Sequence, residues 1–361
     1  MKNENKLLII TNFFKKKNQY GGRQSIALRN IRLLKKIFNN KVLIVKLKKK
    51  KLNSFYKLFR GYIDGIDNFI LKNLIKNIKK NKIKKIFIDG SNLGEIVRFI
   101  KKEIPEIKIY TFFHNVESIF FLSLFKNKMN IHSFCVFLAN YIAERKSVKF
   151  SDKIILLSKR DSKKLYDIYG RYADCICPLS VDDKLKYNHK IKINFFKEPY
   201  ILFVGTAFYG NIQGISWFIK NVVPNINVKT YIVGRGFDVL KKKLEVSERV
   251  KVFGFVQNIK QLYLNASIVI APIFHGSGMK LKVAEAMMFG KKIIGTQEAF
   301  SGYNRLPKNF AIIASDACSF SNHINKHLKN DKIKFHPIIR KFYQKNYSNR
   351  SIEKIFKKNI S

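Results

Sequence analysis

The chain has 361 residues, which is long enough for two domains that each bury a core of their own. Hydrophobic residues make up 46% of the sequence, a globular composition that excludes an intrinsically disordered protein. The formal net charge of +47 leaves three interpretations open: nucleic-acid binding, attraction to an anionic membrane surface, and compositional drift towards lysine. Lysine is abundant throughout and far outnumbers arginine, which favours drift with weak membrane attraction.

No apolar run reaches the roughly 18 residues that a membrane-spanning helix needs. The start of the chain is continuously apolar only at Leu7–Ile10, so it predicts a strand rather than a signal peptide, and we expect a cytoplasmic protein. The cysteines agree with this setting because they lack C-x-x-C spacing: Cys135, Cys175, Cys177 and Cys318. Cys175 and Cys177 would share one face of a strand, which predicts core packing.

The first half of the chain predicts alternating strands and helices. The expected strands are residues 6–11, 42–45, 86–89, 107–113, 153–157 and 175–178. After the first strand, Tyr20-Gly21-Gly22-Arg23 opens a helix that runs to about Phe38. A glycine pair between a strand and a helix can form an anion cradle, so Gly21 and Gly22 are candidate binding residues; a flexible turn is the alternative.

Residues 48–85 form a long basic segment that we expect to be mostly helical. Its first part mixes aromatic and basic side chains: Phe55, Tyr56, Phe59, Arg60 and Tyr62. This mixture is typical of a surface that faces a membrane, and it would equally suit packing on the sheet.

His114 directly follows the strand expected at residues 107–113. Open α/β sheets bind ligands at the carboxyl ends of their strands, so His114 is a candidate active-site residue. A structural histidine at a strand end is the alternative. Two apolar helices are expected after it, at residues 117–125 and 132–148, and another helix at 159–170.

The second half again alternates strands and helices, which predicts a parallel sheet with helices on both faces. The expected strands are residues 200–205, 229–234, 250–252, 267–271, 292–296 and 310–314. Pro337 is expected to end a helical region, and residues 342–360 form a basic, helical tail. His323 and His327 are four residues apart without an acidic partner between them, which predicts a solvated helix face rather than a metal site.

A glycine loop at Gly276 and Gly278 lies between an expected strand and a helix that Gly290 would cap. This arrangement aims backbone N–H groups and the positive end of the helix at an anion. Lys280 and Lys282 add positive charge in the same turn. An ordinary βα turn is the alternative.

Glu285 lies one helical turn further on, where its carboxylate can accept hydrogen bonds from a vicinal diol such as a ribose. Together with the glycine loop, this carboxylate favours a site for a nucleotide.

Three segments of the second half occur in a specific order. Residues 201–219 read I-L-F-V-G-T-A-F-Y-G-N-I-Q-G-I-S-W-F-I, residues 252–263 read V-F-G-F-V-Q-N-I-K-Q-L-Y, and residues 276–287 read G-S-G-M-K-L-K-V-A-E-A-M. They resemble, in turn, the opening strand and loop, the nucleobase segment and the donor-site segment in the C-terminal domain of family 4 glycosyltransferases (glycosyl transferases group 1), which have the GT-B fold. In the first half, F-H-N-V-E at residues 113–117 is similar to the segment that places an active-site histidine in these transferases.

The resemblance implies an α/β protein with two doubly wound Rossmann-like domains that face a cleft. Residues 1–185 would form the acceptor-side domain, 186–198 a linker, 199–340 the nucleotide-sugar-binding domain, and 341–361 a helix that crosses back to the first domain. The implied reaction is a retaining, metal-independent transfer of a sugar from a nucleotide-sugar to a hydroxyl of a glycan or lipid-linked acceptor, in bacterial surface polysaccharide assembly.

The resemblance also implies roles for individual residues. His114 would contact the sugar or the acceptor, and backbone around Phe255 and Val256 would hold the base. The donor-binding set is Gly21, Gly22, Thr206, Arg235, Phe255, Val256, Gly276, Ser277, Gly278, Lys280, Lys282 and Glu285. Two features depart from the family: Ser277 stands where a glutamate is common, and residues 206–210 offer no arginine or lysine.

We expect no cofactor and no metal, because the nucleotide-sugar is a substrate. The expected partners are that donor, the acceptor and an anionic membrane surface at the inner face, and no nucleic acid. Two alternatives remain open: a GT-B-type epimerase or other nucleotide-sugar enzyme, and a nucleic-acid-binding protein that would explain the +47 charge.

Overall fold

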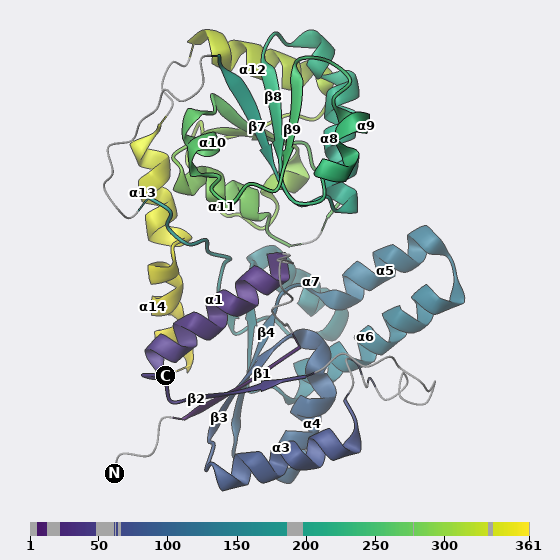
Figure 1. Ribbon diagram of the computed structural model, residues 1–361. Helices are drawn as coiled ribbons and strands as arrows, with labels where there is room; N and C mark the ends of the chain where they lie inside the picture. The colour runs from purple at the N-terminus through teal and green to yellow at the C-terminus, as the bar shows by residue number, and fades with distance from the viewer. Residues whose placement is uncertain are drawn as a thin grey trace. The chain divides into compact units, whose positions relative to one another are not determined.

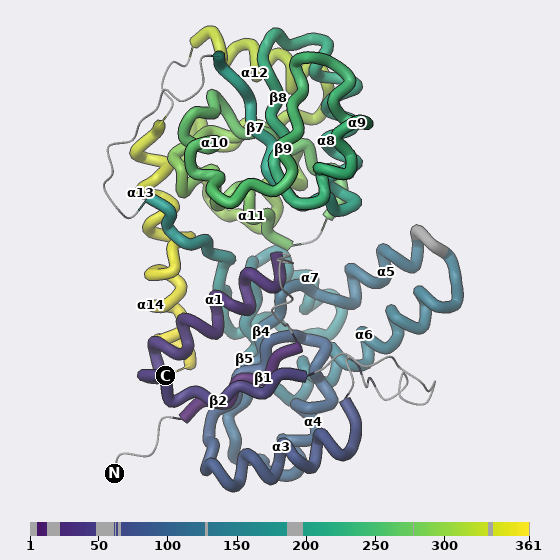
Figure 2. Tube along the Cα trace, in the orientation of Figure 1, coloured from purple at the N-terminus to yellow at the C-terminus, as the bar shows by residue number. Residues whose placement is uncertain are grey.

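The computed structural model describes residues 6–12, 22–47, 61, 63, 66–185, 198–276, 278–330 and 335–360 (Figure 1, Figure 2). The chain divides into two compact units. Unit 1 comprises Met1–Pro178 and Ile352–Ser361, and unit 2 comprises Leu179–Ser351.

Unit 1 is built on a parallel sheet of six strands in the order β2-β1-β3-β4-β5-β6. The strands are β1 (Leu7–Thr11), β2 (Val42–Lys46), β3 (Lys85–Asp89), β4 (Lys108–Phe113), β5 (Lys153–Leu156) and β6 (Cys175–Ile176). In β1, Ile9 pairs with Ile44 on one side and with Phe87 on the other. Every residue of β1 is buried, as a central strand with helices on both faces requires.

Helices and short 3-10 turns connect these strands (Figure 1). They are α1 (Gly22–Ile37), α3 (Asn68–Lys80), η1 (Ser91–Leu93), α4 (Gly94–Glu103), α5 (Glu117–Lys128), α6 (Ile131–Phe150) and α7 (Lys159–Tyr169). The sequence sets their ends locally. Asp67 caps α3 by accepting the N–H of Ile70, and Ser158 caps α7 by accepting the N–H of Asp161. Gly170 ends α7 with φ of 72°.

The first turn of α5 is capped by a carboxylate from α6. Glu144 is fully buried and accepts hydrogen bonds from the N–H groups of Glu117 (2.9 Å) and Ser118 (3.1 Å). The hydroxyl groups of Ser118 (2.7 Å) and Tyr169 (3.1 Å) also donate to it. Burial raises the pKa of Glu144. This carboxylate therefore fastens the two helices together at their base.

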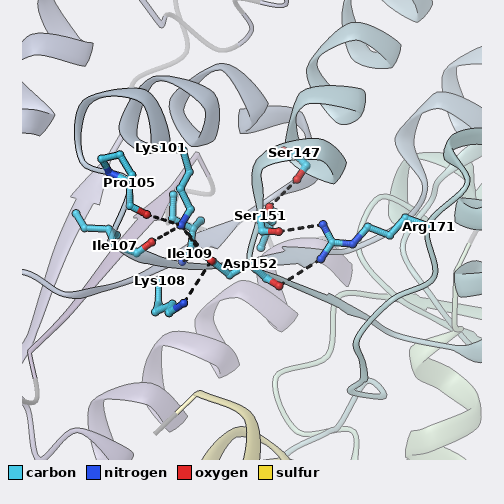
Figure 3. A network of polar contacts seen from close by, with 10 residues as sticks. Lys101, Pro105, Ile107, Lys108, Ile109, Ser147, Ser151, Asp152 and Arg171 are labelled. Atoms are coloured by element: carbon cyan, nitrogen blue, oxygen red, sulfur yellow. Dashed lines mark hydrogen bonds and ion pairs between the residues drawn. The ribbon is translucent and has the colours of Figure 1, made fainter.

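A polar network holds the amino ends of β4 and β5 (Figure 3). The carboxylate of Asp152 pairs with the ammonium of Lys101 at 2.8 Å and accepts the N–H of Ile109 at 2.7 Å. Arg171 donates to the carbonyl oxygens of Ser151 (2.9 Å) and Asp152 (3.2 Å). The network lies at the opposite end of these strands from His114, so it fixes the sheet and leaves the carboxyl ends to carry other side chains.

Unit 2 has a second parallel sheet of six strands, in the order β12-β11-β10-β7-β8-β9. Its strands are β7 (Tyr200–Val204), β8 (Lys229–Val233), β9 (Val250–Gly254), β10 (Ile268–Ala271), β11 (Ile293–Gly295) and β12 (Ala311–Ile313). Its helices are α8 (Tyr209–Asn221), η2 (Val223–Asn225), η3 (Asp238–Leu240), α9 (Lys241–Leu244), α10 (Lys260–Asn265), α11 (Leu281–Met288), η4 (Gln297–Phe300), α12 (Ala317–Asn330) and α13 (Pro337–Asn346). The predicted α/β fold, with two doubly wound Rossmann-like domains, is confirmed.

Each sheet has a point at which the strand order reverses. In unit 1 the reversal lies between β1 and β3, and in unit 2 it lies between β7 and β10. Open α/β sheets bind ligands outside the carboxyl ends of the strands at such a point. The segments that follow β1, β3, β7 and β10 are therefore where a ligand site is expected.

Three expectations about the last part of the chain need correction or refinement. Pro337 begins α13 instead of ending a helix, because a proline at the first helical position lacks only an N–H that would be unpaired there anyway. The expected helical tail is two helices, α13 and α14 (Asn349–Ile360). His327 does not lie on a solvated face: it is buried and hydrogen-bonds the carbonyl oxygen of Ser267 at 3.0 Å.

The cysteines of the sixth strand are buried as predicted. Burial raises the pKa of Cys175 to about 11 and that of Cys177 to about 12, so both remain protonated thiols at neutral pH.

The last helix packs on the sheet of unit 1. Phe356 of α14 is fully buried, and its ring lies edge-on to Phe87 and Phe112, with centroids 6.0 Å and 6.5 Å away. Glu353 pairs with Lys36 of α1 at 2.7 Å. The end of the chain is thus part of the core of unit 1.

Replacing Phe356 by alanine should destabilise unit 1 by about 3–5 kcal/mol, because it removes a fully buried ring and leaves a cavity. Hydrogen exchange in peptides from β3 and β4 should accelerate accordingly. Phe69→Ala, which removes an exposed ring from α3 of the same unit, is the control and should leave exchange unchanged. Equal exchange in both variants would show that α14 does not stabilise the sheet.

Candidate nucleotide site

The glycine loop of unit 2 lies at the reversal point of its sheet. It follows β10, which pairs with β7, and it leads into α11. Gly278 has φ of +66°, a left-handed backbone conformation that residues other than glycine rarely adopt. Gly290 has φ of +62° and follows the last turn of α11, which confirms the predicted cap. Ser277 lies outside the described residues.

Helix α8 approaches this loop closely because of two glycines. A Cβ atom at Gly214 would lie 1.7 Å from the carbonyl oxygen of Pro272, and one at Gly210 would lie 2.7 Å from that of His275. Both glycines are therefore required where the helix meets the loop backbone. Gly210 and Gly214 are four residues apart and lie on one helix face. That spacing was available in the sequence as a signal, although the expected site did not include it.

Lys282 is buried beneath the meeting point of α8 and the loop. Its ammonium donates to the side-chain oxygen of Asn211 at 2.9 Å and lies 3.9 Å from the centroid of the Phe203 ring. Asn211 donates in turn to the carbonyl oxygen of Thr206 at 2.8 Å. The side chain thus links α11 to the first turn of α8 and to the loop after β7.

Burial and the neighbouring charge of Lys280 together lower the pKa of Lys282 to about 7, although Glu285 acts in the opposite direction. The protonation of Lys282 therefore changes near neutral pH instead of well above it. An anion bound beside it would favour the charged form. The charge state of Lys282 therefore depends on what lies beside it.

Lys280 has a different role in the structure. Its ammonium donates to the carbonyl oxygen of Gly278 at 2.9 Å and pairs with Glu298 at 2.8 Å. The hydroxyl of Tyr303 donates to its backbone oxygen at 2.7 Å. Lys280 thus fastens the glycine loop, and Glu298 already offsets its charge.

Glu285 lies on α11, one turn beyond Lys282. It accepts the hydroxyl of Tyr263 at 3.1 Å, and the ammonium of Lys184 lies 3.8 Å from its other oxygen. Burial raises the pKa of Glu285, although Lys184 and the Tyr263 hydroxyl act in the opposite direction. Sequence reasoning missed both partners, since they lie 22 and 101 residues away along the chain (285 − 263 and 285 − 184).

The loops after β7, β8 and β9 carry the remaining candidates of unit 2. Thr206 is exposed, and Arg235 places its guanidinium 4.7 Å from the centroid of the exposed Phe255 ring. Val256 is half-buried beside it. Phe208 and Tyr209, which follow Thr206, are also exposed aromatic residues. Exposed rings at the carboxyl ends of these strands are suited to stacking against a planar ligand.

His114 belongs to a buried polar cluster in unit 1. Its Nε2 lies 3.1 Å from the carboxylate of Asp89, at the end of β3. Thr11 donates to the same carboxylate at 3.0 Å and Asn30 at 3.4 Å. All four residues are buried. The cluster lies at the reversal point of that sheet, and Asp89 fixes the orientation of the histidine ring. The two glycines assigned to this unit's loop are placed as follows: Gly22 begins α1, and Gly21 lies outside the described residues.

Within the described ranges, no group of three or more His, Cys, Asp or Glu side chains is arranged to hold a metal ion. The same part of the chain contains no helix that has both the length and the hydropathy to cross a membrane.

The chain is similar to several known proteins. Residues 198–330 match the family described as glycosyl transferases group 1. A Klebsiella pneumoniae protein described as an uncharacterized 44.6 kDa protein in cps region is 25% identical over 271 residues, which cover 68% of this chain and 67% of that protein.

Two solved structures share the fold over nearly the whole chain. The Anabaena protein Alr3699/HepE, crystallised with UDP, superposes with a TM-score of 0.65 at 14% identity, covering 97% of each chain. The lipopolysaccharide outer core galactosyltransferase WaaB, in its apo form, superposes with a TM-score of 0.62 at 13% identity, covering 97% of this chain and 98% of WaaB. The resemblance to glycosyl transferases group 1 is thus confirmed for residues 198–330, and the fold of the chain is that of GT-B glycosyltransferases.

The pKa of Lys282 generates a test of the site. Its folded-state pKa of about 7 lies below the usual value of 10.5, so between these pH values the native protein lacks a proton that the unfolded chain holds. If the diphosphate of a nucleotide-sugar pairs with Lys282, it requires the charged form of the lysine. Binding at pH 8 should therefore take up about one proton, and binding at pH 6 much less. Calorimetry in buffers with different ionisation enthalpies measures this uptake.

Lys282→Met should abolish the proton uptake and weaken nucleotide-sugar binding by at least about tenfold, because a charge-assisted hydrogen bond is lost. Lys220→Met, which removes an exposed lysine from the last turn of α8, is the control. Proton uptake that persists in Lys282→Met would assign the titration to another group.

Glu285→Gln should weaken nucleotide-sugar binding by about tenfold without lowering the melting temperature, since an amide keeps one acceptor and removes a partly buried charge. Glu198→Gln, at an exposed position of the same unit, should leave binding unchanged. A variant that unfolds would show that Glu285 is structural and would refute the assignment to a ribose contact.

Proposed function

We propose that the protein is a glycosyltransferase that moves a sugar from a nucleotide-sugar to a hydroxyl of an acceptor. The observation that carries this proposal is the site at the β7/β10 reversal point. There, a glycine loop, the first turn of α8, a buried lysine and a partly buried glutamate converge. The match of residues 198–330 to glycosyl transferases group 1 supports it, and so does the Anabaena structure with UDP.

The donor would bind with its diphosphate against the loop of Gly276 and Gly278. The ammonium of Lys282, protonated as the anion arrives, would pair with the phosphate oxygens. Glu285 would accept hydrogen bonds from the ribose hydroxyl groups, in the place where it now accepts that of Tyr263. The base would lie near Phe255 and Val256, beside the guanidinium of Arg235.

In the transfer step the bond between the anomeric carbon and the diphosphate oxygen would break, and a bond from that carbon to the acceptor oxygen would form. The proton of the acceptor hydroxyl would pass to the leaving diphosphate. The leaving diphosphate gains negative charge, which Lys282 and the loop N–H groups would stabilise without a metal ion. We propose retention of the anomeric configuration, as is usual in family 4, although Ser277 replaces the glutamate common there. His114, oriented by Asp89, would contact the sugar or the acceptor.

The acceptor we propose is a glycan or lipid-linked sugar in bacterial surface polysaccharide assembly. Two neighbours support this context: the Klebsiella relative is described by its place in a cps region, and WaaB acts in the lipopolysaccharide outer core. Such an acceptor would be reached from a peripheral position at the inner face of a membrane. The segment first considered for membrane contact, residues 48–60, lies outside the described residues.

A panel of nucleotide-sugars, screened by thermal shift, tests the donor assignment. A donor at about 100 times its Kd should stabilise the native state by roughly 2.7 kcal/mol. The shift should be strongly reduced in Lys282→Met and kept in Lys220→Met. A panel that stabilises neither the wild type nor the control would contradict nucleotide-sugar binding.

Product analysis then separates transfer from epimerisation. A transferase consumes the donor productively only when an acceptor is present, whereas an epimerase converts the sugar without one. Activity should survive a chelator, because Lys282 and the loop amides would stabilise the diphosphate. Donor isomerisation in the absence of acceptor would overturn the proposed reaction while preserving the nucleotide site.

A further inference from the structure

Helices α5 and α6 form a hairpin that extends away from the sheet of unit 1 (Figure 1). The two helices are joined at Met129 and Asn130. Met129 has a left-handed backbone and closes α5 with a hydrogen bond from its N–H to the carbonyl of Phe125. Asn130 caps α6 by accepting the N–H of Ser133 at 2.8 Å. The turn is therefore a defined structure with its own caps.

The base of the hairpin is fixed to the rest of unit 1. Besides the capping of α5 by Glu144, α6 lies so close to α4 that a Cβ atom at Gly94 would be 1.8 Å from the carbonyl oxygen of Ala143. The tip, in contrast, presents large apolar side chains to solvent. Met129 is 76% exposed, Ile131 79% and Phe134 42%.

These exposed residues continue an apolar surface along the hairpin. Phe125 and Phe134 lie 5.4 Å apart across the two helices, and Phe137 and Tyr141 follow along α6 at centroid distances of 6.5 Å and 6.2 Å. A contiguous apolar patch on the surface of a folded unit marks a contact surface, whereas single exposed apolar residues are common.

The charge of the hairpin identifies the kind of partner. From Ser118 to Ala143 the sequence contains no aspartate or glutamate, and its basic residues are Lys126, Lys128 and His132. Lys126 and His132 are exposed. The glutamates on either side are engaged at the base: Glu117 pairs with Arg23 at 2.9 Å, and Glu144 caps α5. An apolar tip with a basic rim complements an anionic lipid surface. It does not complement a second copy of a chain that carries a net charge of +47.

We propose that the tip of the α5–α6 hairpin inserts into the interfacial region of an anionic lipid bilayer. Met129, Ile131 and Phe134 enter the boundary between head groups and acyl chains, and the exposed Lys126 contacts lipid phosphates. The inference rests on the proposed function in that a lipid-linked acceptor is presented at such a surface. It names the segment that makes the contact, which neither the family match nor the fold assigns.

The test is vesicle sedimentation of the full chain at physiological salt, with phosphatidylcholine alone and with roughly a third of phosphatidylglycerol added. Met129→Ser combined with Ile131→Ser should reduce partitioning onto the anionic vesicles by about tenfold or more, since two largely exposed aliphatic side chains lose their burial in lipid. Val239→Ser combined with Ile338→Ser removes two side chains of unit 2 that are 82% and 75% exposed, and it should change nothing.

Insertion itself is visible by fluorescence. A tryptophan placed at the tip by Met129→Trp should be quenched by lipids with brominated acyl chains. The native Trp217, the single tryptophan of the chain, reports the background in the wild type. A tip tryptophan that is no more quenched than this background would overturn the proposal.

Other outcomes also decide the matter. Equal vesicle binding by both double variants would reduce the effect to diffuse electrostatics, and equal binding to neutral and anionic vesicles would refute the anionic partner. A wild-type dimer that the tip substitutions turn into a monomer would make the tip an interface between copies. Nucleotide-sugar binding, measured without vesicles, should be the same in the wild type and the tip variant. If neither protein bound a nucleotide-sugar, the proposed function would be contradicted, whereas the proposal for the hairpin would not.

Discussion

The close approach of α8 to the glycine loop is the constraint on which the site of unit 2 depends. Gly210 and Gly214 let the helix backbone contact the carbonyl oxygens of His275 and Pro272. With any larger residue the helix would have to move away, and Asn211 would no longer reach Lys282. The loop is held from its other side by the pairing of Lys280 with Glu298. A site fixed from both sides would need to gain little order when a ligand binds.

Within this frame, burial gives the two charged residues of α11 opposite shifts. Burial lowers the pKa of Lys282 and raises that of Glu285, because in both cases the uncharged form is favoured away from water. Asn211 and Tyr263 offset part of that cost through hydrogen bonds. The cost of desolvating these two groups is therefore only partly offset without a ligand. A ligand that brings a diphosphate and a diol would restore charge to the lysine and hydrogen bonds to the carboxylate. Selectivity for such a ligand would then follow from desolvation as well as from shape.

Much of the fold could be predicted because buried strands read as short apolar runs: all the strands of both sheets lie within a few residues of the expected positions. The glycine loop could also be predicted from the sequence, since its turn needs glycine at a left-handed position. The tertiary partners of the site residues could not be predicted. The pairing of Lys280 with Glu298, the burial of His327 against Ser267 and the contact of Tyr263 with Glu285 all join distant segments. Local patterns carry no information on such pairs. The sequence therefore predicted the same role, binding of an anion, for Lys280 and Lys282.

The same limit explains why overall charge is a poor guide to partners in this chain. A net charge of +47 spread over the sequence attracts any polyanion and distinguishes none. One kind of partner is distinguished from another by surfaces that lack acidic residues and expose several apolar residues together. The α5–α6 hairpin combines both features, and Glu117 and Glu144, the acidic residues at its ends, are engaged at its base. Diffuse attraction would bring the protein to an anionic surface in any orientation. A fixed apolar tip would select one orientation, and unit 1, which carries the hairpin, would then be the part of the chain that meets the lipid.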